Sequence, residues 1–304
     1  MSVLKHVLAV SLVAGVVAGA AFAASRDYGP WEQAVRVKSI PGTDPSFNGA
    51  ALDGCPFISR DGRTFYMASN RPGGLGGIDI WVSRRASVDD PWGAPANVGA
   101  PVNSAANDFC PTISRDGHLF YFVSNREDGC GGDDIYTTRL RPDGWDPVEN
   151  LGCGVNSSAN EASPFPLPER AEGPVLYFSS TRSGAGDLFR SVSHGGVFGT
   201  PEALAGVNSS TANDGQPSLR RDGLEIFFFS TRPGGLGMQD LYSASRASVK
   251  ESWSTPVNLG PLVNSPAPDT RPSLSWDGTT LYFGSGRPGG DGDSDHYVTT
   301  RSGG

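Results

Sequence analysis

The fold of this chain is best approached from residues 69–84, SNRPGGLGGIDIWVSR, where a glycine-rich segment runs into an apolar one. A segment of this kind can be a phosphate-binding loop, which holds its anion against the first N–H groups of a helix. Here the following residues, 79–83, read as a strand rather than a helix. We therefore interpret the glycines as a turn between two strands.

This segment recurs along the chain together with a second shared element. Related copies start at residues 124, 179, 230 and 285, and each follows an element such as DGCPFISRDGRTFYMA (53–68). One proline marks each element at a spacing of 53 to 55 residues: Pro56, Pro111, Pro164, Pro217 and Pro272. Steady self-similarity at such a period indicates a repeat architecture.

Each repeat contains the signals of four strands. In the first repeat these are a short strand at 57–58, a turn at 60–62, and strands at 64–68, 79–83 and 92–98. The turn contains Gly62, and glycine readily adopts the positive φ that such turns require. Four antiparallel strands per unit of this length predict an all-β fold, a five-bladed β-propeller.

The two ends of the chain predict how the propeller closes. The fifth repeat stops soon after its third strand, whereas residues 29–53 match the fourth-strand segments at 90–108 and 251–269. Pairing of the N-terminal strand with the last blade would remove two exposed sheet edges. We therefore expect one mixed blade, built from both ends of the chain.

The units, with SRDG, YF, a GG-G turn and a closing D[IL][YW], resemble the WD40-like β-propeller repeats of the TolB type, found mostly in exported bacterial proteins. The resemblance covers nearly all of the chain after residue 23. The third repeat departs from it, because residues 166–170 (PLPER) replace the Ser-Arg-Asp-Gly turn. The resemblance implies the propeller fold; function remains open, since propellers serve binding, scaffolding and catalysis.

The domain organisation follows from the repeats and the N-terminus. Lys5, an apolar run at 7–17 and the Ala-Phe-Ala of 21–23 predict a signal peptide over 1–23 and a periplasmic or secreted protein. Residues 24–304 are predicted to form a single monomeric propeller without a membrane span. Its predicted repeats cover 53–107, 108–160, 161–213, 214–268, and 269–304 together with 30–52.

Several classes of function are disfavoured by composition and motifs. The net charge is −8 and there is no Lys/Arg cluster, so we expect no nucleic-acid partner. A Gly-x-Ser-x-Gly elbow and a paired-His zinc motif are both missing, and His118 and His194 fall in turns or loops. A serine hydrolase or a zinc enzyme is therefore not expected.

An arginine and an aspartate recur around every glycine-rich turn. We expect them to form charge-assisted pairs that join the second and third strands of each blade. The expected pairs are Arg71 with Asp79, Arg126 with Asp134, Arg182 with Asp187, Arg232 with Asp240, and Arg287 with Asp295.

A second recurring acid precedes each marker proline, and propeller geometry places all five at one mouth of the central channel. Local hydrogen bonding is one expectation for these carboxylates, and binding of a cation or polar ligand is another. A third is glycoside hydrolysis or elimination, for which Glu161 with Asp108 or Asp214 are the catalytic candidates. The ring comprises Asp53, Asp108, Glu161, Asp214 and Asp269.

Two further groups of residues are candidates for binding calcium and for capping turns. The run DGDSD resembles the first half of a calcium loop, so Asp291, Asp293 and Asp295 are candidate calcium ligands, although no cofactor is required. The recurring Asn103, Asn156, Asn208 and Asn264 are expected to cap turns.

The four cysteines fit an oxidising compartment. Three connectivities are possible. We favour Cys130 with Cys153, which lie in loops of one repeat, and Cys55 with Cys110, which hold equivalent positions in adjacent repeats.

The leading functional hypothesis is an exported propeller that recognises a protein partner or a polar ligand, such as a saccharide, at the channel mouth. The alternative is a carbohydrate-active enzyme that uses the same mouth. The two hypotheses differ in one structural respect. An enzyme needs two carboxylates in different environments, about 5–10 Å apart around a pocket. In a scaffold we expect all five carboxylates to have similar environments and to be fully hydrogen-bonded.

Overall fold

The computed structural model describes residues 28–169 and 173–303, which are almost entirely strands and turns. A single turn of 3-10 helix, η1 (Val37–Ser39), precedes the first blade. No helix in the described part of the chain is long and apolar enough to cross a membrane. The predicted signal peptide, residues 1–23, lies outside the described residues.

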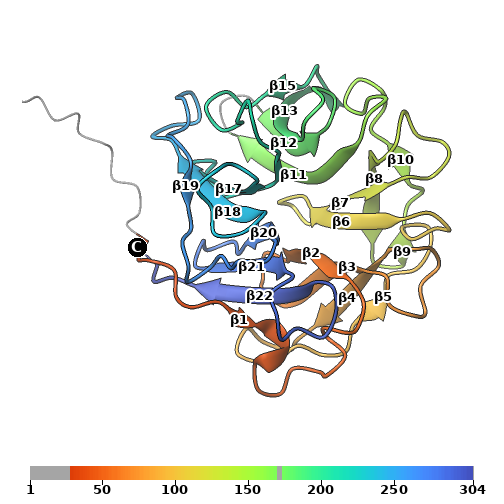
Figure 1. Ribbon diagram of the computed structural model, residues 1–304. Coiled ribbons are helices and arrows are strands. Elements are labelled where there is room, and N and C mark those ends of the chain that lie inside the picture. Colours follow the sequence, from red (N-terminus) through yellow and green to blue (C-terminus); the bar gives the residue numbers. More distant parts are fainter. Residues whose placement is uncertain (1–27, 170–172, 304) are drawn as a thin grey trace, which may run out of the picture.

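The described strands form five antiparallel sheets around a central axis, which confirms the predicted five-bladed β-propeller (Figure 1). Blade 1 contains β2 (Asp53–Ile58), β3 (Thr64–Ser69), β4 (Asp79–Arg84) and β5 (Ala96–Asn97). Blade 2 contains β6 (Asp108–Ile113), β7 (Leu119–Ser124), β8 (Asp134–Arg141) and β10 (Glu149–Asn150), with β9 (Gly144–Trp145) also paired to β8. Blade 3 contains β11 (Glu161–Glu169), β12 (Gly173–Ser180), β13 (Asp187–His194) and β15 (Glu202–Ala203), with β14 (Val197–Phe198) also paired to β13. Blade 4 contains β16 (Asp214–Leu219), β17 (Glu225–Ser230), β18 (Asp240–Ser245) and β19 (Val257–Asn258). Blade 5 contains β20 (Asp269–Leu274), β21 (Thr280–Ser285), β22 (Asp295–Thr300) and β1 (Val35–Arg36).

The N-terminal strand closes the ring, as its similarity to the fourth-strand segments predicts. β1 pairs antiparallel with β22, and Val35 lies opposite Val298. Figure 1 shows β1, coloured red, beside the blue β22. The outer strands are shorter than predicted, since β5 covers only Ala96–Asn97 of the expected 92–98. A short outermost strand offers little edge for pairing with another molecule.

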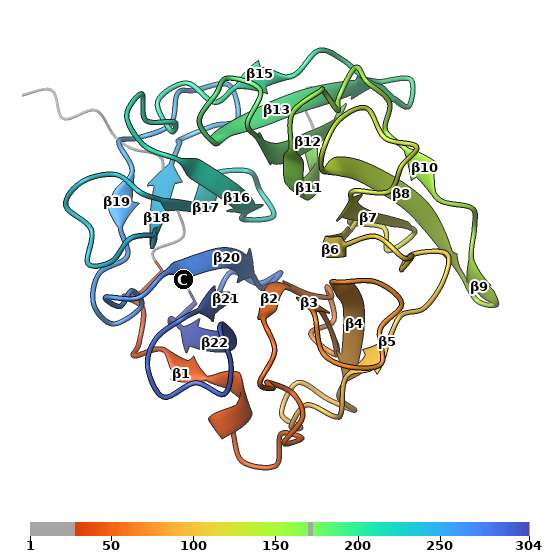
Figure 2. The ribbon, with the colours of Figure 1, turned by 45° about the vertical axis from the view of Figure 1, so that its right-hand side comes forward.

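The first strand of every blade lines the central channel. Each of β2, β6, β11, β16 and β20 contacts the next, and β20 contacts β2 to complete the circle (Figure 2). Equivalent positions of all five strands line one small cavity in the channel, so these strands run in the same direction. Their first residues therefore meet at one mouth of the channel and their last residues at the other.

The hydrophobic core lies between neighbouring blades. The second strands are covered on both faces, and Phe120 to Ser124 of β7 are all buried. Such a strand appears in the sequence as a short, unbroken apolar run rather than an alternating one. Tyr66 of blade 1 packs edge-on against Phe120 of blade 2, with ring centres 5.3 Å apart. Burial of these aromatic side chains ties each blade to the next.

The glycine-rich segment of 69–84 is a turn between β3 and β4, as predicted, with no helix behind it. Gly73 has a φ of +96°, a conformation that a residue with a Cβ rarely adopts. Gly76 packs closely against the loop that leads into blade 2. A Cβ on Gly76 would lie 1.9 Å from the carbonyl oxygen of Ala106. The glycines therefore serve backbone geometry and close blade-to-blade packing.

The third blade replaces the missing Ser-Arg-Asp-Gly turn with a longer first strand, which extends to the buried Glu169. The Glu169 carboxylate accepts a hydrogen bond from the Tyr177 hydroxyl and a 2.9 Å hydrogen bond from Nη2 of Arg246. Arg246 lies just beyond β18 of blade 4. The substituted residues thus form a buried connection between two blades.

Both favoured disulfide pairings are confirmed. Cys55 bonds Cys110 across the first strands of blades 1 and 2, and Cys130 bonds Cys153 within blade 2. Two disulfides fit a protein that matures in an oxidising compartment.

One buried histidine should make the stability of the propeller sensitive to acid. His296 of β22 is fully buried beside Phe47 and Phe65, with ring centres 6.0 and 5.2 Å away. Neither of its ring nitrogens has a hydrogen-bond partner among the described residues. Burial lowers the pKa of His296 to about 4, from 6.5. The neutral ring is therefore the form that the folded state accommodates.

We expect a His296→Phe variant to resist acid better than the wild type. Because the unfolded state binds the proton more tightly, wild-type stability falls as the pH drops from 6.5 towards 4, by at most roughly 3 kcal/mol from this group. Phenylalanine has no proton to bind and suits the aromatic surroundings. Urea unfolding at several pH values measures the difference between the two proteins. A constant difference from pH 7 to pH 4 would contradict this role for His296.

Candidate functional site

The five recurring acids lie where the first strands begin, at the mouth of the channel that the sequence predicts for them. They are fully buried, each with a side-chain exposure of 0%. We call this end of the channel the acid mouth and define it by Asp53, Asp108, Glu161, Asp214 and Asp269.

Every acid of the ring has an arginine partner from the turn after the second strand of the same blade. The distances from the arginine Nη2 to the carboxylate are 2.6 Å for Arg71–Asp53, 2.7 Å for Arg126–Asp108, 3.0 Å for Arg182–Glu161, 2.6 Å for Arg232–Asp214 and 2.7 Å for Arg287–Asp269. A backbone N–H also donates to each acid, as from Ser104 to Asp108 at 2.6 Å. Charge-assisted hydrogen bonds of this kind compensate the loss of hydration of a buried carboxylate.

The prediction that each arginine pairs with the aspartate after its own glycine-rich turn is wrong. In blade 1, Arg71 pairs with Asp53, whereas the carboxylate of Asp79 accepts hydrogen bonds from the N–H groups of Leu75 and Gly76. Asp79 therefore holds the glycine-rich turn in place, and the arginine is left to neutralise the first strand's acid.

The recurring asparagines do more than cap turns. The side chain of Asn103 accepts a hydrogen bond from the Ile80 N–H at 2.8 Å and donates to the Ile80 carbonyl at 2.9 Å. The side-chain amide thus bonds both backbone groups of one residue in the third strand of the preceding blade, as the backbone of a neighbouring strand does. Asn156, Asn208 and Asn264 form the same pair of bonds.

The candidate catalytic residues, Glu161, Asp108 and Asp214, share one environment. All three are buried, paired with arginine and bonded to a serine N–H from the preceding loop. Glu161 differs mainly in its longer side chain, which also accepts a hydrogen bond from the Ser180 hydroxyl. The structure thus has the five similar, satisfied carboxylates expected of a scaffold, and their roles in catalysis or ligand binding stay predictions.

The acid mouth also contains one distinctive carboxylate that the repeat pattern conceals. Asp133 is half-buried and directly precedes Asp134 at the start of β8. Burial and the neighbouring carboxylates of Asp134 and Glu161 raise the pKa of Asp133 above its usual range. Its equivalents in other blades are not acids, so the repeats draw no attention to it. A raised carboxyl pKa is the property that a general acid needs.

The calcium candidates are held by protein groups. The Asp291 carboxylate lies 2.9 Å from Lys38 Nζ and 3.3 Å from Arg36 Nη1, and Asp295 accepts a hydrogen bond from the Asp291 N–H. Asp293 is exposed. Within residues 28–169 and 173–303, no group of three or more His, Cys, Asp or Glu side chains is arranged to hold a metal ion. Calcium binding stays a prediction.

The opposite end of the channel opens into a cavity of about 500 Å³. It lies where the first strands end, among the turns that follow them, and its floor includes Phe57, Phe165 and Leu274. This volume is within the range of small-molecule binding sites. Apolar walls with a few polar groups are also typical of such sites.

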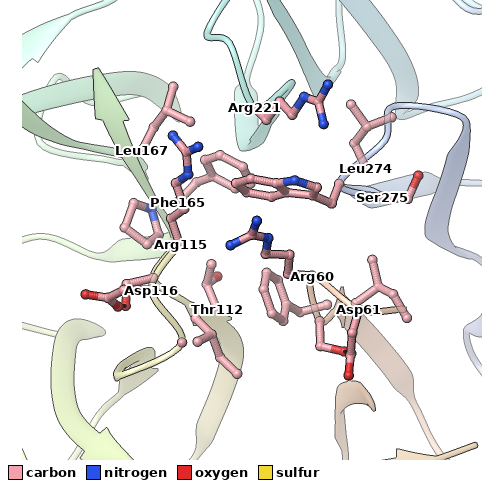
Figure 3. A pocket seen from close by; sticks show the side chains of 18 of the residues that line it. Arg60, Asp61, Thr112, Arg115, Asp116, Phe165, Leu167, Arg221, Leu274 and Ser275 are labelled. Atoms are coloured by element: carbon pink, nitrogen blue, oxygen red, sulfur yellow. Dashed lines mark hydrogen bonds between the residues drawn. The ribbon is translucent and has the colours of Figure 1, made fainter. Parts of the chain in front are cut away.

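Arginines and one tryptophan give this cavity its chemical character. Arg60, Arg115 and Arg221 are exposed and converge on the same space (Figure 3). The guanidinium carbons of Arg60 and Arg115 lie 5.0 and 5.2 Å from the centre of the Trp276 ring. We call this end the basic mouth and define it by Arg60, Arg115, Arg221 and Trp276.

The carboxylates near the basic mouth have other partners. The Ser59 hydroxyl donates to Asp61 and the Ser114 hydroxyl donates to Asp116, which lowers the pKa of both carboxyls. Asp222 pairs with Arg220, not with Arg221. In the described structure, the three guanidinium groups of the basic mouth therefore have no carboxylate partner. They are free to bind an anion, which arginine recognises through two parallel hydrogen bonds.

The sequence analysis does not single out the basic mouth. Its residues occupy one position of each turn, the second, but that position varies among Arg60, Arg115, Pro168, Arg221 and Trp276. The only signal is that three of these five residues are arginines.

Taken together, the fold and the two mouths define a five-bladed propeller with a ligand-sized, positively charged cavity. In comparisons with known proteins, no family model matches the chain, and no curated protein matches it.

Solved structures that share the fold are mostly described as glycoside hydrolases. The α-L-arabinofuranosidase from Lactobacillus brevis is 14% identical with a TM-score of 0.57, over 88% of this chain and 94% of that one. The GH62 α-L-arabinofuranosidase from Coprinopsis cinerea is 12% identical with a TM-score of 0.56, over 90% and 98%. The α-L-arabinofuranosidase from Podospora anserina, solved with cellotriose, is 12% identical with a TM-score of 0.54, over 90% and 97%. At these identities the likeness shows the fold alone, and the resemblance to TolB-type repeats stays a prediction.

Proposed function

We propose that this chain is an exported, carbohydrate-directed propeller that binds an acidic saccharide at the basic mouth. The observation that carries the proposal is the cavity of about 500 Å³, lined by Trp276 and by three guanidinium groups that have no carboxylate partner among the described residues. The chain as a whole has a net charge of −8, so this concentration of positive charge is local. A cleft lined by one sign of charge attracts ligands of the opposite sign.

The shape and chemistry of the cavity support a sugar acid in particular. A uronic acid carries a carboxylate that a guanidinium group can hold by two hydrogen bonds. The indole of Trp276 offers apolar surface together with an N–H donor, which suits a ring that has both C–H and hydroxyl groups. The structural neighbours, described as glycoside hydrolases, favour a saccharide over a protein partner. The two disulfides support export.

Binding of tetragalacturonate, followed by calorimetry, tests the proposal. We expect the wild type to bind it in a salt-sensitive manner and to bind neutral cellotetraose at least about tenfold more weakly. Replacing Arg60, Arg115 and Arg221 together with glutamine should weaken tetragalacturonate binding by more than about a hundredfold, because each charge-assisted bond contributes about 1.5–3 kcal/mol.

Lys250 provides the control for the loss of one positive charge, and it is compared with the single variant Arg115→Gln. It is exposed and lies outside the cavity, so Lys250→Gln removes a positive charge without changing the basic mouth. This variant should bind like the wild type. If Lys250→Gln weakened tetragalacturonate binding as much as Arg115→Gln does, the effect would come from net charge. The basic mouth would then not be the binding site. Binding of an acidic peptide but not of tetragalacturonate would favour a protein partner instead.

A glycoside hydrolase or lyase acting at the acid mouth is the second candidate. The names of the structural neighbours favour it, as does the raised pKa of Asp133 next to Glu161. In this proposal Asp133, rather than Asp108 or Asp214, is the proton donor, and Glu161 is the second catalytic carboxylate. Release of reducing ends from arabinoxylan by the wild type, and its loss in Asp133→Asn, would support the enzyme. An inactive wild type would leave saccharide binding as the function.

A further inference from the structure

An unusual backbone feature is repeated in the first strand of all five blades. The residue before each marker proline has a positive φ: 47° at Cys55, 48° at Cys110, 52° at Ser163, 59° at Gln216 and 56° at Arg271. Non-glycine residues seldom adopt this conformation. At each position the register of the first two strands also shifts, as between Thr270 and Ser273 in blade 5. A β-bulge of this kind changes the direction in which a side chain points.

The bulges direct these five side chains to the channel. All five line a cavity of about 40 Å³, together with the marker prolines. Four of the five are uncharged and have partners. Cys55 is bonded to Cys110, Ser163 donates to the sulfur of Cys110 at 3.3 Å, and Gln216 accepts a hydrogen bond from the Arg271 N–H at 2.7 Å. The fifth position is therefore the exception.

Arg271 brings an uncompensated positive charge into this cavity. Its Nε is buried and has no hydrogen-bond partner among the described residues, and Nη1 has only a 3.4 Å contact with the Thr270 hydroxyl. No carboxylate lines the cavity. Burial lowers the pKa of Arg271, but arginine remains protonated in proteins. Arg271 as a whole is half-buried, and a partly desolvated cation without a counter-charge beside it is unfavourable.

The cavity has room for a counter-ion. A cavity needs about 10–15 Å³ of such volume to hold one water molecule, so about 40 Å³ accommodates a monatomic anion. It adjoins the basic mouth, since Phe57, Thr112 and Phe165 line both spaces.

We propose that Arg271 holds a halide ion, such as chloride, in the channel of the folded propeller. The guanidinium group supplies the charge and the Nε–H donor, and the ring of bulged residues and prolines supplies the enclosure. This site is distinct from the saccharide site proposed for the basic mouth and does not depend on it.

Thermal unfolding at constant ionic strength tests the halide site. Replacing isethionate, an anion too large for the cavity, with chloride should raise the melting temperature of the wild type by about 5 °C at a hundred times the dissociation constant. Arg271→Gln should show no such response. In isethionate it should melt above the wild type, because it lacks the uncompensated charge. Lys250→Gln, which lies outside both cavities, should respond to chloride as the wild type does.

A direct measurement on the unchanged protein complements these variants. Crystals soaked in bromide should give an anomalous peak within hydrogen-bond distance of Arg271. Equal melting temperatures in chloride and isethionate, with no bromide at Arg271, would overturn the proposal. Stabilisation by acetate but not by chloride would also overturn it, because the anion would then be a carboxylate rather than a halide.

Discussion

Replacing Arg126 with methionine should lower the free energy of unfolding by roughly 3–5 kcal/mol, the usual cost of breaking a buried ion pair from one side. Asp108 has a side-chain exposure of 0% and lies 2.7 Å from the guanidinium group of Arg126. In the variant, this carboxylate would keep only the N–H and hydroxyl donors of Ser104. For a domain of this size, the change corresponds to a drop of roughly 6–20 °C in melting temperature, measurable by calorimetry.

An exposed pair in the same blade provides the control. Arg141 lies 2.9 Å from Asp146, but their side chains are 55% and 35% exposed, so Arg141→Met should leave the melting temperature close to that of the wild type. Adding Asp108→Asn to Arg126→Met should recover part of the lost stability, because the buried charge is then removed. Similar stability of Arg126→Met and Arg141→Met would show that the ring pairs do not stabilise the fold.

The fold could be predicted because every blade solves the same physical problem. A first strand must begin with a compensated acid, a turn must let the next blade approach closely, and a second strand must be apolar on both faces. Residues that meet these needs recur with the blade, so the marker prolines, from Pro56 to Pro272, give the number of blades. The match of residues 29–53 to fourth-strand segments predicted the closure, because the last blade lacked one strand.

Pairings within the repeat could not be predicted in the same way. Asp53, Arg71 and Asp79 all recur with the same period, so the spacing cannot show which acid the arginine contacts. The outcome depends on the glycine-rich turn, whose N–H groups already occupy the carboxylate of Asp79. Only the folded backbone shows that these donors point inward.

The candidate binding site could not be predicted because its residues do not recur. A ligand breaks the symmetry of the ring, so the residues that face it need not recur. Trp276 and Arg271 each occur in one blade, at positions where the other blades have different residues. A search for recurring residues finds what stabilises the propeller, whereas its function depends on departures from the repeat.

Removing the channel disulfide should have the second large effect on stability. A Cys55→Ala/Cys110→Ala variant loses a bond that spans 55 residues and joins blades 1 and 2. Loop-closure entropy for that length gives a loss of about 4 kcal/mol, and the two missing sulfur atoms would also leave the channel less well packed. Urea unfolding of the variant beside the wild type measures this loss.

The second disulfide is the matched comparison, since it spans only 23 residues within one blade. Its removal, by Cys130→Ala/Cys153→Ala, should cost about 3 kcal/mol on the same entropy estimate. The channel bond should matter more, because it also joins two blades at the centre of the ring. A channel variant as stable as the wild type would contradict this, as would four free thiols in the denatured, unreduced wild type. In either case the blades would be held by their aromatic cores and buried ion pairs alone.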